Sequence, residues 1–61
     1  MNPEIKKYDG DKIEGGSDSY DYWSEEFNCE KKDLIEAIFK VGNLANVVLS
    51  YLEMNGKIKE N

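Results

Sequence analysis

The chain has no histidine and no arginine, and its 61 residues include a single cysteine and a single proline. One cysteine cannot form an intramolecular disulfide, and a Cys/His zinc site cannot be assembled without histidine. The sequence also has no glycine-rich phosphate loop and no nucleophile elbow. We therefore predict that the protein is not an enzyme, with no catalytic residue, metal site, cofactor or small-molecule substrate.

Long hydrophobic runs are also missing. The longest mostly apolar stretch, residues 44–52, includes Asn46 and Ser50, and it is shorter than the about 20 residues needed to span a bilayer. The first lysines are not followed by an apolar stretch, so they do not resemble a secretory signal. A lone cysteine is typical of a reducing compartment. We predict a cytoplasmic protein with no membrane partner.

Basic residues are outnumbered, with thirteen acidic residues against eight lysines and a net charge of −5. Nucleic-acid-binding proteins usually have a basic face and use arginine for bidentate contacts. A negative net charge opposes binding to any polyanion. The composition therefore disfavours a nucleic-acid partner. A domain this small is only marginally stable, so close helix packing or association with another chain must stabilise it.

Apolar residues recur at helical spacing in three segments. Tyr20, Trp23 and Phe27 share one face and predict a helix over residues 19–27. The same periodicity predicts helices over residues 31–41 and 44–54. The predicted core consists of Trp23, Phe27, Leu34, Ile38, Val41, Val47, Val48, Tyr51 and Leu52.

Turn residues separate the predicted helices. Asn28 is suited to the left-handed residue that ends a helix, Gly42 ends the second helix, and Asn43 is expected to cap the third. The prediction is an all-α, compact three-helix domain over residues 17–55. An irregular, partly flexible arm over residues 1–16 precedes it, with Ile13 lying back against the helices. A frayed tail over residues 56–61 follows it.

The segment from residue 22 to residue 38 resembles a helix-turn-helix unit. Asn28 takes the place of the turn glycine, while Phe27, Cys29 and Leu34 take the apolar positions that lock the two helices together. The resemblance implies a helix-turn-helix-like arrangement of the first two helices. Because free cysteine is commonly buried, Cys29 at this position is expected to be a buried structural residue.

A narrower resemblance covers residues 11–52. The run Asp21-Tyr22-Trp23-Ser24-Glu25-Glu26-Phe27 is followed by Leu34, Ala37, Val41-Gly42-Asn43, Val48 and Tyr51-Leu52. This pattern resembles the domain of unknown function 3606 family of small bacterial proteins. Two departures are that Asn28 and Cys29 replace the Gly-Val of the family's turn, and that Glu30 replaces a capping serine. The resemblance implies a fold and supplies no activity.

Several apolar residues lie off the predicted core. Ile35, Phe39 and Leu49 project away from the main apolar stripe, and Tyr22 lies off the aromatic face of its helix. We interpret Tyr22, Ile35, Phe39 and Leu49 as candidate protein contacts. The leading hypothesis is a protein-interaction module that binds a protein partner or a second copy of itself.

The main alternative is a helix-turn-helix DNA-binding protein, in which the 31–41 helix contacts DNA through Lys31, Lys32 and Lys40. Glu30, Asp33 and Glu36 would repel phosphates on this surface. Pairs at i, i+4 such as Lys32–Glu36 and Glu36–Lys40 explain the same charges as a solvated face. A third hypothesis is that the acidic N-terminal arm contacts a basic partner protein.

Overall fold

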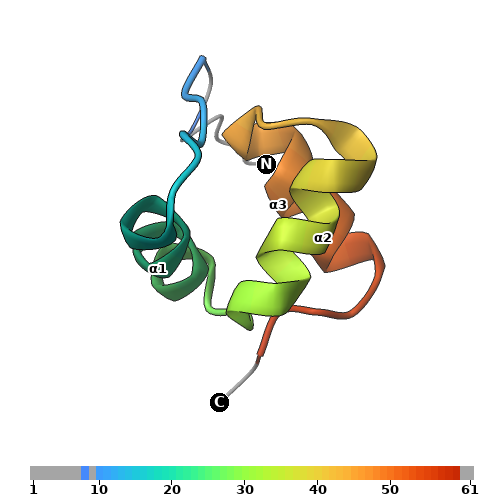
Figure 1. Cartoon of the computed structure of the whole chain (residues 1–61). Helices are drawn as coiled ribbons and strands as arrows, with labels where there is room; N and C mark the ends of the chain where they lie inside the picture. Colours follow the sequence, from blue (N-terminus) through green and yellow to red (C-terminus); the bar gives the residue numbers. More distant parts are fainter. Residues whose placement is uncertain (1–7, 9, 60–61) are drawn as a thin grey trace.

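The computed structural model describes residue 8 and residues 10–59, and these form three helices. The helices are α1 (Ser17–Phe27), α2 (Lys31–Val41) and α3 (Ala45–Met54). Helix α2 packs against both α1 and α3 (Figure 1). No strand occurs among these described residues, although two isolated backbone bridges do. The predicted all-α, three-helix fold is confirmed, with α1 starting two residues earlier and α3 one residue later than expected.

The core lies between α2 and α3, and it also includes Ile13 before α1, Phe27 at the end of α1 and Cys29 in the turn that follows. In α3, Ala45, Val48 and Leu52 are fully buried and follow i, i+3, i+7 spacing. Val41 and Val47 were expected inside, but they are 38% and 41% exposed. Helical spacing places Val47 on the side of α3 opposite the buried stripe, and Val41 is the last residue of α2. The other core residues are Ile13, Phe27, Cys29, Leu34 and Ala37.

The aromatic residues of α1 pack with one another at the edge of this core. The Trp23 and Phe27 ring centroids are 5.3 Å apart. The Tyr8 ring stands edge-on to both, at 5.6 Å from Trp23 and 5.2 Å from Phe27, a favourable geometry for aromatic pairs. The predicted core role of Trp23 is confirmed in a half-buried position.

Helices α1 and α3 end in the same way. Asn28 is left-handed (φ 57°, ψ 51°), as predicted. Its N–H donates to the Glu25 carbonyl, and the Cys29 N–H donates to the Ser24 carbonyl, which is the Schellman pattern. After α3 the pattern recurs around Gly56 (φ 67°). Each motif turns the chain sharply and satisfies carbonyls that the helix leaves unpaired.

The helix starts differ from the prediction. The residue before α3 is Leu44, and Asn43 makes no side-chain cap. The Ala45 N–H instead donates to the Asp11 carbonyl at 3.0 Å, and the Ile13 N–H donates to the Asn43 carbonyl at 2.8 Å. The arm therefore supplies the partner that a capping side chain would have supplied, and it places Ile13, 1% exposed, in the core. Residues 1–7 and 9 of the expected arm lie outside the described residues.

Part of the tail that was expected to fray makes contacts with the rest of the fold. Ile58 forms a backbone bridge with Cys29 and packs against the core. Figure 1 shows this segment passing close to the start of α2. Residues 60–61 lie outside the described residues. Fraying was expected because the last residues of a chain are commonly poorly ordered, but the second Schellman turn directs residues 57–59 toward the first.

Candidate interaction surface

The outer face of α2 carries the most exposed large apolar side chain of the described residues. Phe39 is 87% exposed and Ile35 is 41% exposed. They share this face with Lys32 and Glu36, because positions 32, 35, 36 and 39 follow i, i+3, i+4, i+7 spacing. We call these four residues the α2 outer face. The expectation that Ile35 and Phe39 project away from the core is confirmed.

The other two candidate protein contacts lie elsewhere. Leu49 is half-buried and packs against the core, so the expectation that it projects away is wrong. Its i+4 spacing from Ala45 places it beside the buried stripe of α3. Tyr22 is 60% exposed on α1, with its ring edge-on to Trp23 at 5.3 Å. The structure therefore brings together two of the four predicted contacts.

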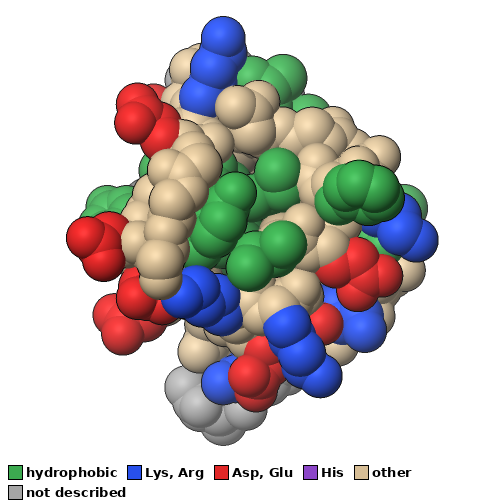
Figure 2. Space-filling view, viewed as in Figure 1, with side chains coloured by type: hydrophobic (Ala, Val, Ile, Leu, Met, Phe, Trp, Pro, Cys, Tyr) green, Lys and Arg blue, Asp and Glu red, His purple; other side chains and the backbone are tan. Residues whose placement is uncertain are grey.

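Charge is distributed unequally between α1 and α2. Helix α1 contains four acidic residues and no lysine: Asp18, Asp21, Glu25 and Glu26. Helix α2 contains three lysines and two acidic residues: Lys31, Lys32, Lys40, Asp33 and Glu36. Figure 2 shows acidic groups along the outer side of α1, mixed charges over α2, and hydrophobic side chains between the two helices. The two helices therefore present surfaces of different charge to a partner.

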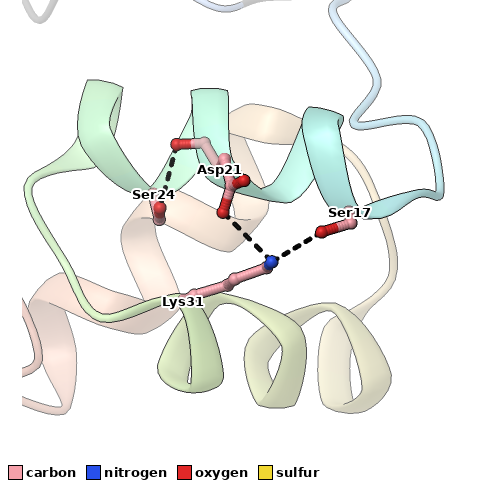
Figure 3. A network of polar contacts seen from close by, with 4 residues as sticks. All are labelled: Ser17, Asp21, Ser24 and Lys31. Carbon is pink, nitrogen blue, oxygen red and sulfur yellow. Dashed lines mark hydrogen bonds and ion pairs between the residues drawn. The ribbon is translucent and has the colours of Figure 1, made fainter.

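Lys31 is engaged between α1 and α2. Its Nζ lies 3.0 Å from Asp21 Oδ1 and donates a hydrogen bond to Ser17 Oγ at 2.8 Å. Figure 3 shows the lysine reaching from the start of α2 across to α1. Ser24, which is buried, donates its own hydroxyl to the Asp21 carbonyl at 3.0 Å. The first of the candidate nucleic-acid contacts is thus part of a helix-to-helix bridge.

The other two candidate nucleic-acid contacts stay on the surface. Lys40 Nζ lies 3.9 Å from Glu36 Oε2 within α2, as the i, i+4 spacing predicted. Lys32 is exposed, and the pair expected between Lys32 and Glu36 is not formed. Glu36 therefore forms its ion pair with Lys40, one turn further along α2, and not with Lys32, one turn before it.

The segment after α3 covers the start of α2, which sequence reasoning missed. The Lys59 N–H donates to the Asn28 carbonyl at 2.8 Å, and Asn28 Nδ2 donates to the Lys59 carbonyl at 2.7 Å. Lys59 Nζ lies 3.3 Å from Glu30 Oε2, and Lys57 Nζ lies 3.9 Å from Asp33 Oδ1. The chain's own lysines therefore neutralise both carboxylates at the start of α2. The local sequence carries one signal for this contact, the alternation of polar and apolar residues in Lys57-Ile58-Lys59. Such alternation is typical of an extended segment with one face buried.

Cys29 is buried in the turn between α1 and α2, as expected. It is 6% exposed and packs in the core. Burial raises the pKa of its thiol above the ordinary value of 9.0, and the Asp33 carboxylate raises it further, while Lys59 acts in the opposite direction. The raised pKa keeps the thiol in its protonated form at neutral pH, and burial shields it from solvent, so both disfavour reaction at Cys29.

The described residues contain no cluster of three or more His, Cys, Asp or Glu side chains placed to hold a metal ion. Within the same residues, no helix has the length and apolar character needed to cross a membrane.

The structure thus defines a small three-helix domain with short connections, an aromatic cluster at the edge of its core and exposed Ile35 and Phe39 on the outer face of α2. The chain belongs to the family described as protein of unknown function (DUF3606), whose model matches residues 3–53. The resemblance seen in the sequence is confirmed. No curated protein and no solved structure matches the chain.

Proposed function

We propose that this protein is a non-catalytic protein-interaction module whose contact surface is the α2 outer face. The observation that carries the proposal is Phe39, an aromatic side chain left 87% exposed. Burying such a side chain against a partner is worth about 1.5–3 kcal/mol, and aromatic residues, phenylalanine included, are enriched at the centre of protein interfaces. Ile35 extends the apolar surface by one helical turn.

The absence of histidine from the sequence and the raised pKa of the Cys29 thiol support a non-catalytic role. The same buried, unpaired cysteine supports a cytoplasmic location.

The alternative, a helix-turn-helix that binds DNA through α2, has weaker support. The second helix of such a unit enters the major groove with its N-terminal residues. Here the start of α2 is occupied by residues 57–59, and Lys31 is bridged to α1. Fluorescence anisotropy of a labelled duplex at low and physiological salt tests it. Salt-dependent binding that weakens when Lys32 and Lys40 are changed to alanine would favour DNA binding over our proposal.

Site-specific photo-crosslinking in the producing cell tests the interaction module directly. A photoreactive phenylalanine analogue replaces Phe39, and the matched control places it at Met54, which is 85% exposed on α3. We expect a discrete crosslinked product from position 39 that position 54 does not give, identified by mass spectrometry. No product at 39, or the same products at both positions, would contradict the α2 outer face as the contact surface.

A further inference from the structure

Net charge restricts how two copies of this chain can meet. Each copy carries −5, so most approaches between two copies are repulsive. Helix α1 adds four acidic residues and no lysine to such a contact. The outward-facing charges of α2 are different, because Lys32 and Lys40 outnumber Glu36. Among the helix faces that carry an exposed aromatic, α2 is therefore the one where two copies repel least.

Resting on the proposed function, we propose that the occupant of the α2 outer face is a second copy of this chain. The two α2 helices pack antiparallel around a two-fold axis, as in an isologous dimer. If the axis passes near position 38, position 36 of one copy faces position 40 of the other. Glu36 then pairs with Lys40 of the second copy, and the symmetry forms this pair twice. Phe39 lies next to the axis and packs against Phe39 of the second copy.

The ion pair within one copy leaves these charges available. Glu36 Oε2 and Lys40 Nζ are 3.9 Å apart, and the two side chains are 51% and 54% exposed. A pair of this length and exposure contributes little, so exchanging it for a pair across the dimer costs little. One helix face is smaller than the about 800 Å² per partner of a standard interface. We therefore expect a reversible dimer with a dissociation constant in the micromolar range, on the order of 10–100 μM.

Charge exchange between two copies tests the arrangement. Sedimentation equilibrium of the full chain, at low salt and from about 1 μM to 1 mM protein, measures the dissociation constant. Glu36→Lys places two Lys–Lys contacts across the dimer, and Lys40→Glu places two Glu–Glu contacts. Each variant alone should dissociate roughly tenfold more readily. An equal mixture of the two variants should recover dimers, because both contacts then join lysine to glutamate.

A matched pair of substitutions controls for general effects of charge. Phe39→Asp should raise the dissociation constant at least about tenfold, while Met54→Asp, at an equally exposed site on α3, should leave it within about twofold. Circular dichroism confirms that each variant folds. A wild-type chain that stays monomeric throughout, or a mixture that does not recover dimers, would overturn the proposal. A crosslinked partner of a different sequence at position 39 would overturn it while leaving the interaction module intact.

Discussion

Cys29 and Ile58 form an antiparallel backbone bridge that ties the turn between α1 and α2 to the residues after α3. Cys29 is the last residue of one Schellman turn, and Ile58 directly follows the other. The hydrogen bonds between Asn28 and Lys59 extend the same contact. The turn after α1 and the turn after α3 are far apart in sequence, yet the residues that follow them are hydrogen-bonded to each other. Residues 57–59 therefore hold the end of the chain against the start of α2.

Ile58 should contribute measurably to stability, because it packs against the core. Ile58→Ala is expected to lower the free energy of unfolding by about 1–2 kcal/mol, below the range for a fully buried isoleucine since Ile58 is half-buried. It should also speed the reaction of Cys29 with a thiol reagent. Urea denaturation measures the first effect. Met54→Ala, at an 85% exposed site, is the control and should change stability by less than about 0.5 kcal/mol; equal effects would contradict the packing role.

Burial of Cys29 predicts a stability change at alkaline pH. Burial raises the pKa of the thiol above 9.0 in the folded chain, so well below that pH the thiol is protonated in both the folded and the unfolded chain. As the pH rises further, the unfolded chain loses its proton first and is favoured. The free energy of unfolding should therefore fall above pH 9, by at most about 1.4 kcal/mol per pH unit.

The Cys29→Ala variant isolates this effect from the lysines and tyrosines that titrate in the same range. Denaturant titrations from neutral pH to above pH 9 should show a steeper loss of stability for the natural chain than for the variant. If the free energy of unfolding fell equally with pH in the natural chain and in the variant, the thiol would have the same pKa in the folded and the unfolded chain.

Asn28 should tolerate glycine better than alanine, because its backbone is left-handed. Asn28→Gly keeps that conformation and loses the hydrogen bond to Lys59, which is worth about 0.5–1.5 kcal/mol. Asn28→Ala loses the same bond and adds a left-handed penalty of about 1–2 kcal/mol. Thermal or urea unfolding of the two variants measures the difference. An alanine variant as stable as the glycine variant would mean that the turn can adopt another conformation.

Lys31 and Lys32 offer a neighbouring pair for testing the bridge between α1 and α2. Lys31→Met removes the contacts to Asp21 and Ser17 and should lower the free energy of unfolding by about 0.5–1 kcal/mol at low salt. The loss should shrink as salt is added, because salt screens exposed charges. Lys32→Met should have almost no effect, since Lys32 is exposed and makes no such bridge. Equal effects would mean that the bridge contributes nothing.

Several features of the fold could be predicted because they depend on neighbouring residues. Helical spacing located α2 and identified Ile35 and Phe39 as outward-facing. The left-handed turn followed from asparagine's tolerance of that conformation. Cys29 was expected to be buried because it takes an apolar position of the turn and free cysteine is commonly buried, and it is buried.

Tertiary structure decided the rest, because each of these features depends on residues distant in sequence. Val47 and Leu49 flank the buried Val48, and only the placement of α3 against the core determined that Leu49 packs against it while Val47 is exposed. The α3 cap came from the backbone of Asp11, and the partners of Glu30 and Lys31 came from residues 59 and 21. The sequence by itself determined three amphipathic helices and their turns, since periodicity and backbone preference are local. Packing determined which residues at the margins of the apolar stripes are buried and which charges are paired, because both depend on segments distant in sequence.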